Sequence, residues 1–405
     1  MDRSVNRIAL LKNRIQEYAW GSKTFIPELL GSPAPAENPQ AELWMGIHPN
    51  GPSMVSWKNA WIPLRDLIEK DPESVLGKSV AGKFSNTLPF LFKILAANRP
   101  LSIQAHPSLN QAREGFAKEN RLQIPLTASH RNYKDNNHKP EILCALSHFW
   151  ALKGFRKVEE IFFLVDKIGI SALESQIAPF RKRPNSAGLK AFFSALMTIK
   201  REQQSELISA IVETIGRLND THPAYEWMIK LHQTFPGDIG VLAPVFLNLV
   251  RLQPGEAIYL PAGELHGYLE GAAIELMANS DNVLRGGLTP KHVDAPELLR
   301  TLNFEYGEAN ILDPESRRGA EWLYPAPVEE FALSQISLHE GSAFKSEQKR
   351  SVEIMICVEG RAHIKDAGSR TTLALERGTA IIIPAVVKQY QIEGKATIYK
   401  AAVPL

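Results

Sequence analysis

The sequence predicts a mainly β protein with a helical insertion, organised as two β-barrels and one α-helical domain. Three observations favour this fold class. Residues 1–150 and 246–405 hold many short apolar segments separated by glycine and proline, which is typical of strands joined by turns. Residues 151–245 instead repeat apolar side chains at helical spacing. A glycine–proline spacing that starts at Gly255 recurs at Gly378 and indicates a degenerate internal repeat.

Residues 1–150 are predicted to form the first part of a barrel from short strands and turns. Within them, residues 31–39 have the composition of a loop, because Pro33, Pro35 and Pro39 interrupt any regular element.

Residues 151–245 are predicted to be a helical domain inserted into that barrel. Apolar side chains recur at helical spacing in two stretches, Val158, Ile161, Phe162, Val165 and Ile168, then Leu207, Ile208, Ile211, Val212, Ile215 and Leu218. We expect these stripes to be packing faces.

Residues 246–325 are predicted to complete the first barrel and to carry one candidate metal ligand. Ala257 to Leu260 form a short apolar segment typical of a strand, and Pro261 and Gly263 then force a tight turn. The turn would carry the imidazole of His266 onto the next short strand. The spacing favours a metal ligand, and an ordinary core or surface histidine is the alternative.

Residues 326–405 are predicted to be a second barrel that binds no metal. Gly378 and Pro384 keep the spacing of Gly255 and Pro261, but Gln389 stands where the repeat would place a second histidine. Coincidence is the alternative, since a turn glycine, an apolar strand and a proline are common.

The composition excludes several classes of partner. The 405 residues carry a formal net charge of +2, which gives no reason to expect a nucleic acid or an anionic membrane as partner. The first residues are charged and lack the apolar centre of a signal peptide, and no apolar segment approaches the ~18 residues of a membrane span. Cys144 and Cys357 lie in apolar strand-like segments, so we expect buried free thiols in a cytoplasmic protein. We expect a monomer or a weak dimer.

A short segment upstream offers partners for His266. Residues 101–106 alternate apolar and polar side chains, so Ser102, Gln104 and His106 would share one face of a strand. A solvated antiparallel strand would show the same pattern.

A second upstream segment adds a carboxylate. Lys139 and Glu141 would fall on one face of an extended chain, which Pro140 favours. Glu141 begins an apolar segment, where an unpaired charge is costly and a cation is needed. A surface pair of Lys139 with Glu141 is the alternative.

Gln104, His106, Glu141 and His266 together make a candidate metal site. Two imidazoles and one carboxylate suit Zn²⁺, with iron, manganese and nickel as weaker fits. The amide oxygen of Gln104 would be an unusual fourth ligand. Because the set carries one negative charge, a bound zinc ion keeps net positive charge and stays a Lewis acid.

Nine segments in this order resemble the type I phosphomannose isomerases, zinc-dependent members of the cupin superfamily. They are Tyr18–Gly21, Glu42–Gly46, His48–Pro49, Leu88–Lys93, Ser102–Pro107, Asn137–Glu141, Phe235–Val241, Pro261–His266 and Ser280–Lys291. The turn before His266 resembles the second half of the cupin metal pattern, with Glu270 in place of the usual asparagine. The resemblance implies two cupin-type (jelly-roll) barrels, one Zn²⁺ on Gln104, His106, Glu141 and His266, and interconversion of mannose 6-phosphate and fructose 6-phosphate through a cis-enediol.

Four residues are candidates for catalysis. The resemblance places Arg285 in the active site, where we expect it to move a proton or stabilise charge, and Lys291 comes from the same stretch. Glu275 lies in an apolar segment, where burial would raise its pKa, although an ion pair with Arg285 or Lys291 is an alternative. Lys139 could act as base or acid.

Three residues are candidates for substrate binding. The sequence has no glycine-rich phosphate loop, so side chains must bind the phosphate. Ser102 shares the predicted face of Gln104, and Lys93 lies in an apolar segment where its charge needs an anion. A pair of Lys93 with Glu42 or another carboxylate is the alternative. Tyr268 could donate a hydrogen bond to the sugar. Trp44 and His48 are expected to brace the barrel wall.

Two other functions were weighed. A metal-dependent cupin oxygenase would use two histidines and one carboxylate with open positions, and a fourth ligand at Gln104 argues against it. A non-catalytic sugar-binding cupin would fit the second barrel alone. The expected substrate is a small-molecule sugar phosphate.

Overall fold

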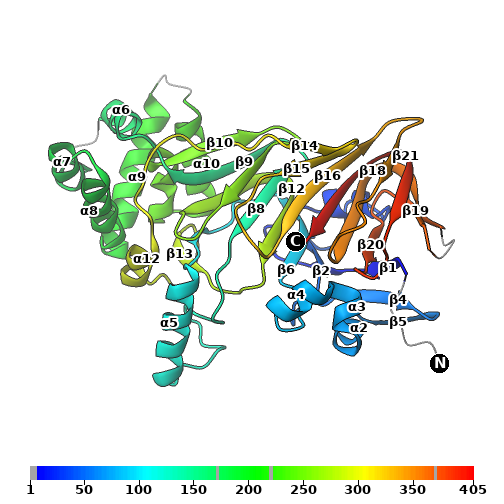
Figure 1. Ribbon diagram of the computed structural model, residues 1–405. Coiled ribbons are helices and arrows are strands. Elements are labelled where there is room, and N and C mark those ends of the chain that lie inside the picture. Colours follow the sequence, from blue (N-terminus) through cyan, green and yellow to red (C-terminus); the bar gives the residue numbers. More distant parts are fainter. Residues whose placement is uncertain (1–6, 170–172, 219–221, 369–371) are drawn as a thin grey trace.

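Two antiparallel β-sheets with helices packed at one end form the computed structural model, which describes residues 7–169, 173–218, 222–368 and 372–405 (Figure 1). Among these residues the first sheet has ten strands: β2 (Arg14–Gln16), β3 (Glu42–Met45), β6 (Phe90–Ala97), β7 (Ile103–Ala105), β8 (Glu141–Ala145), β9 (Phe149–Phe155), β10 (Leu247–Leu252), β11 (Ala257–Leu260), β12 (His266–Ala278) and β13 (Leu284–Gly287). The predicted fold class, mainly β with a helical insertion, is confirmed.

The second sheet contains the first and the last strand of the described residues, β1 and β21. Within the described ranges its eleven strands are β1 (Ala9–Lys12), β4 (Met54–Trp57), β5 (Ala60–Pro63), β14 (Glu315–Arg318), β15 (Glu321–Tyr324), β16 (Ala332–Leu338), β17 (Ala343–Lys345), β18 (Glu353–Asp366), β19 (Thr372–Glu376), β20 (Ala380–Ile383) and β21 (Tyr390–Ala402). β1 pairs with β20 on one side and with β4 on the other. The four predicted domain ranges stay a prediction. The second sheet crosses them, because β1, β4 and β5 of the first range lie in one sheet with strands of the last range.

The helical insertion lies at the end of the molecule opposite β18 to β21 (Figure 1). It comprises α6 (Val158–Ile168), α7 (Glu174–Lys182), α8 (Ser186–Met197), α9 (Arg201–Arg217), α10 (Pro223–Thr234), the 3₁₀ helix η2 (Ile239–Leu242) and α11 (Ala243–Phe246). The predicted stripes are packing faces, since Ile161, Val165, Ile208 and Ile211 are all buried in one apolar cluster.

Other helices arise where the sequence was expected to give only strands and turns. They are α1 (Phe25–Leu29), α2 (Leu64–Lys70), α3 (Pro72–Leu76), α4 (Lys78–Lys83) and α5 (Leu109–Arg121), and α12 (Ala295–Thr301) follows the first sheet. α5 begins with a capping box in which the Ser108 hydroxyl accepts from the Gln111 amide and the Gln111 side chain accepts from the Ser108 amide. The expectation for residues 1–150 was wrong here, and this serine-to-glutamine spacing was the signal that could have corrected it.

Three strands are longer than the predicted short ones. β12, β18 and β21 span 13, 14 and 13 residues. Each runs through a glycine with positive φ, Gly271, Gly360 and Gly394, and β12 and β18 shift register near that glycine. These three glycines therefore lie within continuous strands and bend them, as β-bulges do, which makes the strands longer than the short ones that we predict.

Both sheets contribute to one apolar core. Ile94 and Ile274 of the first sheet and Ile354 and Ala401 of the second belong to the same buried cluster. Cys144 and Cys357 are buried free thiols, as predicted.

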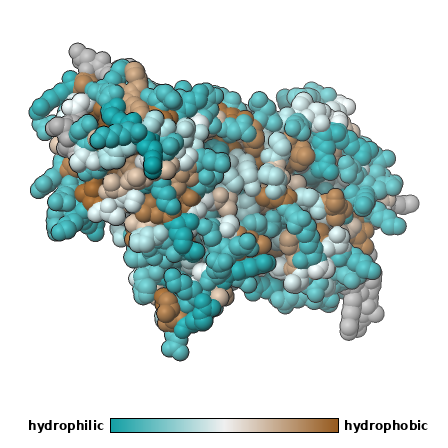
Figure 2. Space-filling view, turned by 60° about the vertical axis from the view of Figure 1, so that its left-hand side comes forward, coloured by the Kyte–Doolittle hydropathy of each residue, from teal (hydrophilic) through white to brown (hydrophobic). Residues whose placement is uncertain are grey.

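The face shown in Figure 2 is mainly hydrophilic with small scattered hydrophobic patches. Among the helices of the described residues, none combines the length and the apolar character needed to cross a bilayer.

Candidate active site

Three side chains from separate segments meet in the first sheet. His106 follows β7, Glu141 begins β8 and His266 begins β12. β12 pairs with both other strands, with His266 opposite Gln104 and Met277 opposite Glu141. One nitrogen or oxygen atom from each of His106, Glu141 and His266 lies within 4.8 Å of the others, and all three residues are buried. The convergence predicted from spacing is therefore present for these three residues.

Each of the two imidazoles points its Nε2 atom toward the Glu141 carboxylate. His106 Nε2 lies 3.3 Å from Glu141 Oε1, and His266 Nε2 lies 3.4 Å from Glu141 Oε2. Neither Nε2 atom finds a hydrogen-bond partner among the described residues, although both atoms are buried. Two buried nitrogens without partners beside a carboxylate fit a bound cation, because such groups otherwise lose their hydration without compensation.

Backbone carbonyls fix the tautomer of both imidazoles. Nδ1 of His106 lies 2.7 Å from the Asn282 carbonyl oxygen, and Nδ1 of His266 lies 2.9 Å from the Glu264 carbonyl oxygen. A carbonyl only accepts, so each Nδ1 carries a hydrogen, and Nε2 is the ring nitrogen left available to a metal ion. This donor set suits zinc.

Burial and nearby charges keep the ligands in metal-binding form. Burial, assisted by the Lys139 charge, lowers the pKa of His106 to about 4, so the ring is neutral at pH 7. Burial works to raise the pKa of Glu141, but Lys139 and the two imidazoles outweigh it and hold that pKa well below its usual value. The carboxylate is therefore ionised.

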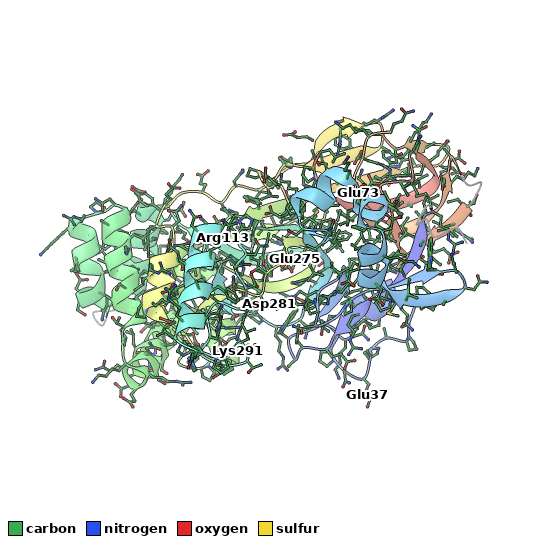
Figure 3. The ribbon with its side chains drawn as sticks, turned by 60° about the horizontal axis from the view of Figure 1, so that its bottom comes forward. Glu37, Glu73, Arg113, Glu275, Asp281 and Lys291 are labelled. Atoms are coloured by element: carbon green, nitrogen blue, oxygen red, sulfur yellow. The ribbon has the colours of Figure 1, made fainter. Side chains whose placement is uncertain are left out.

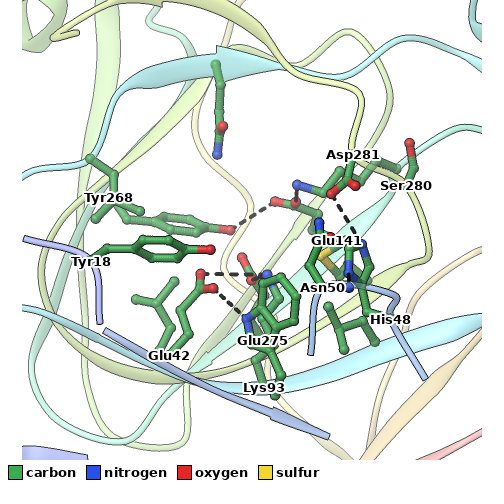
Figure 4. A pocket seen from close by; sticks show the side chains of 17 residues that line it. Tyr18, Glu42, His48, Asn50, Lys93, Glu141, Tyr268, Glu275, Ser280 and Asp281 are labelled. Atoms are coloured by element: carbon green, nitrogen blue, oxygen red, sulfur yellow. Dashed lines mark hydrogen bonds and ion pairs between the residues drawn. The ribbon is translucent and has the colours of Figure 1, made fainter. Parts of the chain in front are cut away.

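A cavity of about 230 Å³ opens beside Glu141. Figure 4 shows Tyr18 and Tyr268 on one side of it, Glu42, Lys93 and Glu275 along another, and His48, Asn50 and Asp281 opposite. Gln104 and Lys139 also line it. The Lys139 ammonium lies 2.9 Å from Glu141 Oε1 and is buried, so the pair is not the surface pair considered as an alternative.

Known proteins that are similar to this chain in sequence and in fold are mannose-6-phosphate isomerases. Three family models match: phosphomannose isomerase type I catalytic domain over residues 8–158, its helical insertion domain over residues 164–247, and the mannose-6-phosphate isomerase cupin domain over residues 321–403. The mannose-6-phosphate isomerase of Escherichia coli is 42% identical, covering 95% of this chain and 96% of that protein. The human mannose-6-phosphate isomerase is 34% identical, covering 94% of each.

The chain belongs to the type I phosphomannose isomerase family. A solved structure of zinc-bound mannose 6-phosphate isomerase aligns with a TM-score of 0.91 and 39% identity over 98% of this chain and all of that one. The predicted zinc cofactor agrees with this neighbour and with the His106, Glu141 and His266 group.

Lys93 and Glu275 form a buried pair beside the zinc-ligand candidates. Lys93 Nζ lies 2.8 Å from Glu275 Oε2 and 3.6 Å from Glu42 Oε1. Glu275 is thus paired with Lys93, and not with Arg285 or Lys291 as the alternative had it. Burial raises the pKa of Glu275, and Lys93 opposes that shift without cancelling it. Burial opposes the charged form of Lys93, but Glu275 and Glu42 raise its pKa overall.

The remaining sequence-predicted residues lie at different distances from the cavity. Tyr268 lines it and donates to Glu141 Oε2 at 3.2 Å. Among the described residues that line it, Leu101 is present and Ser102, which precedes β7, is not. Lys291 lines a separate cavity nearer the helices, and Figure 3 shows it away from Glu275 and Asp281.

Arg285 lies beside the site on β13. It is opposite Gln104 in the pairing of β13 with β7. Partial burial lowers its pKa, and no carboxylate lies within ion-pair distance in the described chain. A half-buried guanidinium without a protein acceptor is suited to an anionic ligand.

Sequence reasoning missed several residues of the cavity wall. Trp44 and His48 were expected to brace the barrel, yet both line the cavity, and His48 Nε2 lies 3.3 Å from Asp281 Oδ1. Trp44 donates to Glu42 Oε2 at 2.6 Å. The alternation of Glu42 and Trp44 on β3 was the available signal, because side chains two apart on a strand share a face.

Gln389, the C-terminal counterpart of His266, allows a test of whether the second barrel binds a metal. Gln389 donates to the Ser346 carbonyl at 3.2 Å, within the part of the chain that matches the cupin-domain model. Replacing Gln389 with alanine is expected to leave zinc content and turnover within about twofold of the parent, since the change removes one half-buried hydrogen bond and none of the residues proposed to hold zinc. Metal analysis and steady-state kinetics check this. Loss of zinc from the variant would contradict the prediction that the second barrel binds no metal.

Proposed function

We propose that this protein interconverts mannose 6-phosphate and fructose 6-phosphate, with zinc held by Gln104, His106, Glu141 and His266. One observation carries the proposal: two buried imidazoles aim Nε2 atoms, which have no hydrogen-bond partner among the described residues, at a buried carboxylate, at the edge of a cavity rich in acids and bases. Gln104 supports its role by lining that cavity opposite His266 in the β7–β12 pairing.

The reaction requires two proton movements. A proton leaves C2 of the open-chain aldose and arrives at C1, while a hydroxyl proton leaves O2 and one is gained at O1. Bound zinc would supply positive charge beside these two oxygens and so lower the cost of the enediolate. General acid–base assistance would contribute about 10²–10⁴-fold.

Two cavity residues are proposed for the proton transfers. Glu275 would move the carbon-bound proton, because its carboxylate is buried and its raised pKa makes it a stronger base than an exposed glutamate. Lys139 would exchange the proton at oxygen, because its ammonium lies 2.9 Å from Glu141 Oε1 and faces the cavity. Lys93 would hold Glu275 in place.

Three cations are proposed for the sugar phosphate. No carboxylate of the described residues pairs with Arg285, so its guanidinium would bind an oxyanion of the substrate. Lys93 would contact the sugar together with Tyr268, since both line the cavity beside Glu141. Lys291, which lines a separate cavity, and Ser102 would contact the phosphate where it reaches beyond the first cavity. The cytoplasmic location and the monomer or weak dimer stay predictions, and the two buried free thiols are compatible with a reducing compartment.

Metal removal tests the proposal directly. The purified protein is expected to convert mannose 6-phosphate to fructose 6-phosphate, detected by a coupled enzyme assay. Dialysis against a chelator should abolish conversion, and zinc should restore it, because the buried ligand set requires a cation. Absence of conversion by zinc-loaded protein would overturn the proposal, and oxygen uptake in its place would favour the cupin oxygenase.

A further inference from the structure

We propose that Asn282 and Asp135 form a clamp that positions the metal ligands, so that Asn282 is a positioning residue for zinc. The inference concerns how firmly the metal is held. It can therefore fail while the proposed isomerase activity stands, and it can hold even if the substrate is a different one.

The backbone of Asn282 contacts a metal-ligand candidate. Its carbonyl oxygen accepts from His106 Nδ1 at 2.7 Å, which fixes the tautomer and the orientation of the ring. Any movement of residue 282 would therefore rotate the His106 ring or break the hydrogen bond of its Nδ1.

The side chain of Asn282 is what holds that carbonyl in place. It is fully buried, with 0% exposure. Its Oδ1 accepts from the amides of Lys134 and Asp135 at 2.7 and 3.2 Å. Its Nδ2 donates to the carbonyls of Asp135 and Asn137, both at 2.9 Å. Both the acceptor and the donor half of the amide are used, which only asparagine at this length can do.

Asp135 closes the clamp from the opposite loop. Its carboxylate accepts from the Ser280 hydroxyl at 2.9 Å, the Asp281 amide at 2.7 Å and the Asn137 amide at 2.9 Å. Residues 134–137 and residues 280–282 are thereby held together by both side chains.

The clamped loop leads directly to the other ligand. Lys139 and Glu141 follow Asn137 within four residues, and the Pro140 carbonyl accepts from the Ala278 amide at the end of β12. On the other side, residues 280–282 lead into β13 and Arg285. One buried amide therefore orients His106 and anchors the segment that carries Glu141.

Replacing Asn282 with aspartate tests the clamp with almost no change of shape. The Nδ2 donor becomes an oxygen that faces the carbonyls of Asp135 and Asn137, so attraction turns into repulsion. We expect zinc to bind about 10–100-fold more weakly and to be released correspondingly faster, the usual cost of losing an outer-shell partner. Zinc release to a chromogenic chelator measures this, and the visible spectrum of the Co²⁺-substituted protein should change because the His106 ring is displaced.

A control separates positioning from general destabilisation. Ser351 is buried in the second sheet region, where its hydroxyl donates to the Val403 carbonyl at 2.7 Å and accepts from the Val403 amide at 3.0 Å. Ser351→Ala should lower the melting temperature of the metal-free protein yet leave zinc release within about twofold of the parent.

Asp135→Asn provides a milder variant that keeps the size of the side chain. It removes one acceptor of the clamp. We expect a rate of zinc release between the rates of the parent and of Asn282→Asp. If Asn282→Asp does not fold, Asp135→Asn carries the test alone. Zinc release within twofold of the parent in the folded clamp variant, or an increase no greater than in Ser351→Ala at equal melting temperature, would overturn the proposal.

Discussion

Replacing His266 with alanine should remove zinc and isomerase activity together. His266 Nε2 lies 3.4 Å from Glu141 Oε2, makes no hydrogen bond and is held by the Glu264 carbonyl through Nδ1. Its loss leaves His106 and Glu141 as the strong ligands. Because metal charge is worth several kcal/mol at an enediolate and about 1.4 kcal/mol is tenfold in rate, turnover should fall by more than about 10³-fold.

Metal analysis and the coupled assay check this result. His363, an exposed histidine on β18, gives the matched control, and His363→Ala should keep both zinc and turnover. Full zinc occupancy in His266→Ala would contradict the prediction and show that the protein holds the ion at another site.

Replacing Lys139 with methionine should preserve zinc but lower turnover by about 10²–10⁴-fold, the usual range for one acid–base group. Methionine keeps an unbranched chain and loses the ammonium that lies 2.9 Å from Glu141 Oε1. The metal should remain, because the imidazoles and the carboxylate are unchanged.

Lys400 is the control for the loss of a buried lysine. It is 5% exposed and pairs with Glu321 and, at 3.6 Å, with Glu353, in the second sheet. Lys400→Met should reduce the free energy of unfolding without a comparable fall in turnover. Equal kinetic losses in the two variants would assign Lys139 a structural role.

The parts of the site that sequence predicted are those set by local geometry. Pro261 and Gly263 determine a turn, and the turn determines where His266 lies. Alternation placed Gln104 in the cavity and His106 at the ligand group, but it failed at Ser102, which precedes β7 and gives way to Leu101 in the cavity wall.

The parts that sequence missed depend on contacts between distant segments. Nothing near Glu275 in the chain indicates Lys93 as its partner, since 182 positions separate them and only the pairing of β12 with β6 brings them together. The same holds for His48 with Asp281 and for Asn282 with the loop at Asp135. Strand length was misjudged for a different reason, because a glycine such as Gly360 can bend a strand as well as end it.

The pairing of β1 with β20 has a consequence for biosynthesis. β1 is synthesised long before β20, because Leu11 of β1 pairs with Ala380 of β20. The edge of β1 that pairs with β20 therefore stays unpaired until the ribosome has made the intervening residues. Such long-range closure is slow and leaves an unpaired strand edge exposed in the nascent chain, so chaperone protection would be most useful to this enzyme before β20 has been made.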